Sequence, residues 1–344
     1  MYLSFILTLN MKQHLLGTVL MAVVATTWTG CDRSPNYRIE PQTVAESHII
    51  RFDSLLLQYE NLTDSSSYRQ MAESLTPFWN IYGRHILGLG DAPYFRNGIN
   101  SFLQDSTIAQ LYADTENSFT NLSYEEQQLS ALTARYLTLF PNLPIPVFQA
   151  HISGLNQSVV TVDSLVSISL DCYLGKNYPL YNRRYNSYEL SLHDRSRIVP
   201  DAGEVLLRNA LPVPRIETLL DVMIYEGKIL YLLAGLLDNN ETTLLTGYTP
   251  DEAQWCANNE KGIWNTIVGN NHLFAADNMT MRKYIAPAPF TAPLTQDAPG
   301  RIGRWVGWRI IEHYVDKQGL SPTQLAVDTT PATDILRLSH YTGK

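Results

Sequence analysis

Charged side chains occur in one segment of the chain that is otherwise apolar. Glu226 and Lys228 lie in the sequence Met-Ile-Tyr-Glu-Gly-Lys-Ile, and a charge among apolar neighbours must be paired or reach water. One interpretation is a polar ligand pocket formed where Glu226 meets Asp171 and an arginine, Arg301 or Arg304. The alternative, which the sequence favours, is a buried structural ion pair that joins this helix to a second one.

A second group of candidate residues lies in residues 173–200, which show neither a helical nor a strand period. The segment contains five tyrosines together with several arginines, and long irregular segments often carry function. Tyrosine and arginine are enriched at the energetic centres of interfaces. They give a candidate binding surface for a glycan, a peptide or a protein, made of Tyr181, Arg183, Arg184 and Tyr185. The alternative is a loop that wraps the domain, with packed tyrosines and solvated arginines.

Cys31 indicates a different chemistry, because the residues before it are typical of an export signal that ends in a lipidation site. Residues 11–14 supply a short positive start, residues 15–28 form an apolar run, and small residues precede the thiol. The run of about 14 residues is shorter than the roughly 20 that a membrane-spanning helix needs. We therefore expect residues 1–31 to be a lipoprotein signal peptide whose Cys31 carries the lipid. A plain secretory signal and an uncleaved anchor are the alternatives.

The charge of the chain excludes some classes of partner. The sequence of 344 residues has a net charge of −8 at pH 7, and the part after residue 31 contains 24 basic and 33 acidic side chains. This balance argues against nucleic acid as a partner and against docking on anionic lipid by charge alone. Membrane contact is therefore expected to come from the lipid at Cys31.

Cysteine and histidine usage predicts neither a metal nor a cofactor. Apart from Cys31 the chain has only Cys172 and Cys256, which excludes a disulfide-rich scaffold and a cysteine-based zinc site. These two cysteines either form one disulfide in an oxidising periplasm or remain free and buried. The eight histidines show no ligand spacing, and no Ser-His-Asp, Cys-His or phosphate-loop pattern occurs.

Apolar spacing predicts an α+β fold that is predominantly helical. Apolar residues at intervals of three and four predict helices over 68–83, 99–117 and 123–139. Segments with period two predict a small β-sheet from strands at 147–152, 158–162 and 165–170. Ser123 and Glu126 form the pattern of a capping box at the start of the third helix.

Two further helices are predicted to form the centre of the domain. The apolar segment 215–237 predicts a central helix, and Thr249-Pro250-Asp251-Glu252 predicts the start of another. A helix over 301–317 carries Gly303 and Gly307 on one face. Two glycines four residues apart let another backbone approach closely, so this helix is expected to pack tightly against the central one.

The domain organisation follows from these elements. Residues 1–31 are the expected signal peptide, and the polar, proline-containing residues 32–48 are the expected tether. Residues 49–344 are then expected to form one globular domain, which is long enough to bury a large core.

Several motifs occur in order along this domain, at residues 170–175, 223–229, 247–250, 255–260, 287–290 and 299–308. Together they resemble the family of gliding-motility-associated lipoprotein B, GldB. The resemblance implies a lipid-anchored protein of the cell envelope, with the outer membrane favoured. It also implies protein partners that belong to a motility or secretion assembly.

That family is distantly similar to zinc metallopeptidases whose active site is a helix bearing His-Glu-x-x-His. In this pattern two histidines bind zinc, and the glutamate takes a proton from the metal-bound water. Tyr225 and Ile229 stand at the histidine positions, and only Glu226 matches. The resemblance therefore implies a degenerate zincin core, a small sheet with a central helix, that lacks its metal site.

The resemblance implies a non-catalytic lipoprotein of the cell envelope that holds or stabilises a gliding or secretion machinery. Two other functions stay open. One is a metal-independent hydrolase with a site around Asp171, Glu226 and the tyrosine-rich segment. The other is a lipoprotein that binds a glycan or a peptide in a groove lined by that segment.

Overall fold

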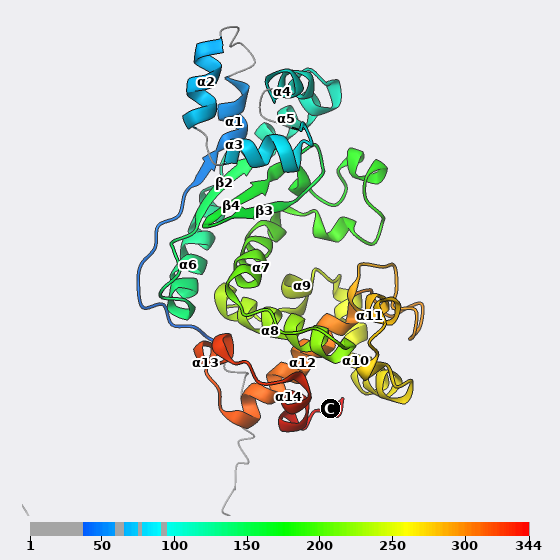
Figure 1. Ribbon diagram of the computed structural model, residues 1–344. Helices are drawn as coiled ribbons and strands as arrows, with labels where there is room; N and C mark the ends of the chain where they lie inside the picture. Colours follow the sequence, from blue (N-terminus) through cyan, green and yellow to red (C-terminus); the bar gives the residue numbers. More distant parts are fainter. Residues whose placement is uncertain (1–36, 59–64, 75–77, 91–94, 344) are drawn as a thin grey trace, which may run out of the picture. The chain divides into compact units, whose positions relative to one another are not determined.

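The computed structural model describes four stretches of the chain, residues 37–58, 65–74, 78–90 and 95–343 (Figure 1). The chain divides into two units, Met1–Ser34 and Pro35–Lys344, and the second contains every described residue. The signal peptide and lipidation site predicted at Cys31 lie outside the described residues.

A four-stranded mixed sheet has the strand order β1-β2-β4-β3. Its strands are β1 (Ile49–Arg51), β2 (Val147–His151), β3 (Val159–Val162) and β4 (Leu165–Ser169). β1, β2 and β4 run parallel, with Phe148 beside Ile49 on one side and Val166 on the other, whereas β3 is antiparallel to β4. The sequence predicted β2, β3 and β4. It missed β1 because this strand has only three residues and leads directly into a helix.

Helices form on both faces of this sheet. On one face Phe148 and Val166 belong to a large apolar core shared with the helices that follow the sheet, and on the other His151 lies against the rings of Phe78 and Tyr82. Helices of the second side are α1 (Phe52–Leu57), α2 (Ser65–Ser74), α3 (Phe78–Ile81), the π-helical turn Tyr82–Ile86, α4 (Phe95–Leu103) and α5 (Ser106–Ser118). The predicted α+β class with mostly helical content is confirmed.

The remaining helices form the larger part of the domain around α8 (Figure 1). They are α6 (Ser123–Leu139), α7 (Ile198–Ala210), α8 (Leu219–Leu237), α9 (Thr242–Thr246), α10 (Pro250–Gly269), α11 (Asn278–Ile285), α12 (Ile302–Gln318), α13 (Pro322–Val327) and α14 (Ala332–Ser339). Most of α8 is buried, which agrees with its nearly uniform apolar sequence. The predicted central helix is therefore confirmed.

Three helix boundaries differ from the sequence expectations. The helix expected over 99–117 is two helices, because Asp105 accepts hydrogen bonds from Thr107 N at 2.8 Å and Ile108 N at 3.1 Å and so begins α5. The helix expected over 68–83 is likewise divided, into α2, α3 and the π-helical turn. The central helix begins at Leu219 rather than residue 215, because Thr218 forms its capping box with Asp221.

Two capping boxes were predicted, and one is present. Thr249 and Glu252 cap α10 as expected, with Glu252 Oε2 accepting from Thr249 N at 2.7 Å. At α6, Ser123 makes no such cap. Glu126 Oε1 instead accepts from Ile49 N at 2.9 Å, so the carboxylate joins α6 to β1.

The closest approach between helices occurs where α8 crosses α12. A Cβ added to Gly307 would lie 1.7 Å from the carbonyl oxygen of Met223, and one added to Gly227 would lie 2.2 Å from the carbonyl carbon of Gly307. Only glycine fits such a contact. The predicted packing of Gly307 against the central helix is thus confirmed. The same prediction for Gly303 is wrong, because Gly303 faces Tyr284 and Ile285 of α11.

Residues 37–48 lie on the globular unit, although the sequence placed them in the tether. Ile39 is buried beside Gly235 of α8. The amide of Gln42 donates to Thr138 Oγ1 at 3.1 Å, and the amide of Ser47 donates to Ser130 Oγ at 2.9 Å. Hydrogen bonds to α6 therefore hold this segment in place, and the domain begins before residue 49.

Candidate functional site

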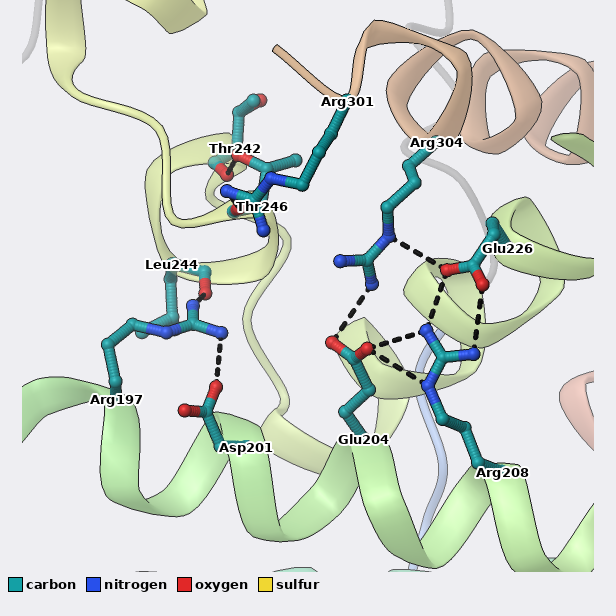
Figure 2. A network of polar contacts seen from close by, with 10 residues as sticks. All are labelled: Arg197, Asp201, Glu204, Arg208, Glu226, Thr242, Leu244, Thr246, Arg301 and Arg304. Atoms are coloured by element: carbon teal, nitrogen blue, oxygen red, sulfur yellow. Dashed lines mark hydrogen bonds and ion pairs between the residues drawn. The ribbon is translucent and has the colours of Figure 1, made fainter. Parts of the chain in front are cut away.

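The charged residues of α8 meet charged residues of two neighbouring helices. Glu226 accepts two hydrogen bonds from Arg208 of α7, at 2.9 Å from Nη1 to Oε1 and at 2.7 Å from Nη2 to Oε2 (Figure 2). This two-point geometry fixes both carboxylate oxygens. Glu226 is 7% exposed, so its charge is held inside the domain by a specific partner.

Arg304 of α12 completes a four-membered ion network with Glu204 and Arg208 of α7 (Figure 2). Arg304 Nε lies 2.8 Å from Glu226 Oε2, and Arg304 Nη2 lies 2.9 Å from Glu204 Oε2. Arg208 Nη2 also donates to Glu204 Oε1 at 2.7 Å. Two carboxylates thus face two guanidinium groups, and three helices are joined through side chains of opposite charge.

Electrostatics keeps Glu204 and the two arginines of this network ionised. Burial alone raises the pKa of Glu204, but Arg304 and Arg208 more than offset burial and hold that pKa well below its usual range. Burial lowers the pKa of Arg304. The charges of Glu204 and Glu226 raise this pKa by more than burial lowers it, so the net shift is upward. Glu204, Arg208 and Arg304 therefore stay charged near neutral pH, which suits a structural junction.

Arg301 lies beside the network but makes a different contact. Its Nη2 donates to the backbone oxygen of Thr246 at 2.9 Å, at the end of α9 (Figure 2). Burial and the nearby Arg304 charge lower the pKa of Arg301. Of the two arginines predicted for the polar site, Arg304 therefore contacts Glu226 and Arg301 anchors the α9 turn.

Asp171 lies at the end of the sheet and makes its contacts there. Its Oδ1 accepts from Ser169 Oγ at 2.5 Å and from Ser153 N at 3.1 Å, and its Oδ2 accepts from Leu155 N at 2.7 Å. Leu155 has a positive φ of 63°, a conformation that this carboxylate helps to hold. Burial raises the pKa of Asp171, although these hydrogen bonds oppose the shift. The structure thus brings Glu226 and Arg304 together and keeps Asp171 in a separate contact set.

The tyrosine-rich segment is built from short 3-10 turns that wrap the domain. Tyr181 is fully buried, and its hydroxyl donates to Asp171 O and accepts from Leu174 N, both at 2.7 Å. It therefore supports the loop and does not line a surface, contrary to the expectation. Tyr185 is half-buried and donates to Leu155 O at 3.0 Å.

The two arginines of the same candidate surface are exposed. Arg184 Nε donates to Leu155 O at 3.2 Å, so its side chain also braces the loop that Asp171 holds. Arg183 extends from the end of the 3-10 turn Pro179–Arg183. Of the four residues, Tyr181 is buried, Tyr185 is half-buried, and Arg183 and Arg184 are exposed.

Cys172 and Cys256 are free and buried, which settles the choice that the sequence left open. Burial raises the pKa of the Cys172 thiol to about 12, so this group stays protonated near neutral pH. A protonated thiol is a poor nucleophile. Within the described residues, no group of three or more histidine, cysteine, aspartate or glutamate side chains is arranged to hold a metal ion.

A cavity of about 500 Å³ is lined by four residues of α8: Asp221, Ile224, Tyr225 and Lys228. Its other walls come from residues 211–215, 217 and 218 and from residues 325, 326 and 328–333, together with Phe274. Tyr225 lines this cavity, whereas Ile229, the other residue at a zinc-ligand position of the peptidase pattern, is fully buried. The volume is in the range of small-ligand sites.

This cavity was not among the sites predicted from the sequence. One signal was available, because Asp221, Ile224, Tyr225 and Lys228 follow the spacing of a single helix face, and all four line the cavity. The remaining walls come from segments far apart in the sequence, and only the fold brings them together.

A family comparison identifies the chain. The model of the family described as gliding motility protein GldB matches residues 34–343, which is nearly the whole of the described unit. The chain belongs to the GldB family. No curated protein and no solved structure matches it.

The match explains why the GldB motifs occur in a fixed order along the chain. It begins at residue 34, and residues 37–48 pack on the domain, so the GldB domain includes part of the expected tether. Among the residues that the structure describes, no helix is both long and apolar enough to cross a membrane.

Proposed function

We propose that this GldB-family protein is a lipid-anchored component of the cell envelope that holds or stabilises a gliding or secretion machinery without catalysing a reaction. The observation that carries the proposal is the family match over residues 34–343. The lipobox-like sequence before Cys31 supports the anchor, because it supplies an acylatable cysteine directly after an export signal.

The geometry of Glu226 also supports a non-catalytic role. Both of its oxygens are engaged by arginine, Oε1 by Arg208 and Oε2 by Arg208 and Arg304. A general base needs a free oxygen within reach of the proton that it removes. A carboxylate held by two guanidinium groups is instead suited to joining α7, α8 and α12.

Anchoring is tested by Cys31→Ala in the native cells. An acyl chain contributes roughly 0.8 kcal/mol per buried methylene to membrane binding, so the variant should leave the membrane fraction after a high-salt wash. Cys256→Ala is the matched control for loss of a thiol and should stay membrane-bound. A Cys31→Ala protein that remains with the membranes would show that the anchor is something else.

The scaffold role is tested by deleting the gene and measuring the abundance of envelope proteins by quantitative mass spectrometry. Members of one assembly should fall together and return when the wild-type chain is restored. Glu226→Gln keeps the shape of the side chain, so a variant that folds and holds its partners should also restore function. A folded Glu226→Gln protein that binds every partner but restores nothing would favour the hydrolase alternative.

A further inference from the structure

The cavity beside α8 combines apolar walls with an exposed apolar rim. Leu211, Ile224 and Leu325 line the interior, and Val213 and Phe274, which are 71% and 59% exposed, lie at the edge. Exposed apolar side chains that surround a concave site mark a surface that a partner covers.

The charged side chains that line the cavity already have partners within the chain. Lys228 Nζ donates to Asp328 O at 2.7 Å and lies 3.7 Å from Asp328 Oδ2. Asp221 Oδ2 accepts from the amides of Glu217 at 3.1 Å and Thr218 at 2.8 Å. Arg215 at the rim pairs with Glu217 at 2.7 Å. An ionic ligand would have to displace one of these partners, so the chemistry favours an uncharged occupant.

The backbone along one wall offers a further contact. Residues 212–216 make no backbone hydrogen bond with any other residue that the structure describes. Pro212 and Pro214 lack an N–H group, which leaves the amides of Val213, Arg215 and Ile216 as donors together with the carbonyl groups of the segment. A lipid tail cannot use such groups, whereas an extended peptide pairs with them.

We infer that this cavity binds an extended, uncharged segment of a partner protein, with a large apolar side chain inside the cavity and the peptide backbone along residues 212–216. The inference rests on the proposed scaffold function, since it names the chemistry by which the protein would hold a partner. The paired charges set specificity by rejecting ionic side chains. The apolar walls and rim supply the contact area.

The experiment uses the full lipoprotein in lipid nanodiscs and an array of synthetic octapeptides of varied sequence. Peptides with a central leucine, methionine or phenylalanine and uncharged neighbours should be retained. Thr329 is exposed and lines the cavity, so Thr329→Trp should fill it and weaken binding at least about tenfold. Thr323 is an exposed threonine of α13 outside the cavity, and Thr323→Trp is the matched control that should bind as the wild type does.

Backbone pairing has its own readout. N-methylation of alternate amides in a retained peptide should weaken binding about tenfold without changing its side chains. Equal binding to the Thr329→Trp and Thr323→Trp proteins would overturn the inference. So would Thr329-dependent binding of 11-(dansylamino)undecanoic acid without binding of any peptide, because the cavity would then take an acyl chain.

The outcome for the cavity can be separated from that for the scaffold role. If no peptide binds while deletion of the gene still lowers the abundance of a set of envelope proteins together, the inference is wrong. The proposed function then holds, and the protein contacts its partners through another surface. If peptides bind in a Thr329-dependent way while no envelope protein depends on the chain, the site is supported and the scaffold role is wrong.

Discussion

Two buried clusters of charge, both involving α12, differ in how many arginines they contain. The cluster of Glu204, Arg208, Glu226 and Arg304 sets two carboxylates against two guanidinium groups. The second cluster lies nearer the C-terminus and holds Glu260, Glu312 and a single arginine, Arg309.

The second cluster completes its contacts with a neutral group. Tyr341 donates to Glu260 Oε1 at 3.0 Å, while Arg309 contacts both carboxylates. Burial, helped by the Glu260 charge, raises the pKa of Glu312 to about 7, although Arg309 opposes the shift. In the first cluster the pKa of Glu204 is lowered instead. The pKa of Glu204, which contacts two arginines, is thus lowered, whereas the pKa of Glu312, which contacts one arginine, is raised.

The largest expected effect comes from breaking the balanced cluster. Glu226→Ala leaves Arg208 and Arg304 each without one carboxylate, and removing one member of a buried pair costs about 3 to 5 kcal/mol. Urea unfolding should therefore show a loss of this size. Glu40→Ala, which removes a carboxylate that is mostly exposed, is the control and should change stability by less than about 0.5 kcal/mol. A Glu226→Ala protein that is as stable as the control would show that the cluster is not structural.

The next effect comes from separating the helices that bring the balanced cluster together. Gly307→Ala places a methyl group against the backbone of α8 at Met223, and overpacking of this kind costs about 1 to 3 kcal/mol, occasionally more. Gly262 in α10 has open space around its Cβ position. Gly262→Ala should therefore stabilise the protein by about 0.5 to 1 kcal/mol. Thermal unfolding of the two variants should shift in opposite directions, and a shift in the same direction would contradict the close approach.

The smallest effect is a difference in pH dependence between the clusters. The folded-state pKa of Glu312 is above its ordinary value of 4.5, so the folded state binds more protons there than the unfolded state does. The stability from this group is complete below pH 4.5 and is lost as the pH rises through about 7. Glu204 has the opposite sign, and its contribution is lost as the pH falls below 4.5.

Variants separate these two contributions. Glu312→Gln removes the titration, so the wild type should lose about 1 to 2 kcal/mol relative to this variant between pH 6 and pH 8. Glu204→Gln should instead differ most from the wild type above pH 5. Parallel stability curves for the wild type and Glu312→Gln would show that Glu312 has an ordinary pKa.

Patterns within a few residues predicted much of the fold. The alternation of apolar residues over 147–170 predicted three strands, and the apolar run predicted the central helix. Thr249 and Glu252 predicted the start of α10. The structure contains all of these elements. The errors came from partners distant in sequence. Glu126 has the spacing of a cap but bonds Ile49, which lies 77 residues away.

The candidate site was predictable only as a conflict between charge and burial. Glu226 in an apolar helix required a partner, and Arg304 was among the residues considered for it. Glu204 and Arg208 were not, because α7 is an ordinary amphipathic helix in which a charged face looks solvated. Asp171 was predicted for the polar site and Tyr181 for the binding surface. Both are instead buried residues that hold one loop in place.

The N-terminal segment determines how the protein would carry mechanical load. Residues 37–48 are held on α6 by the contacts of Gln42 and Ser47, and the chain then enters the sheet through the edge strand β1. If the chain is anchored at Cys31 as proposed, tension from the anchor would act first on the packing of Ile39 against Gly235 of α8 and then on the hydrogen bonds of Gln42 and Ser47. Residues 37–48 thus lie between the proposed anchor and the sheet, and their contacts with α6 and α8 would bear the load before β1 does.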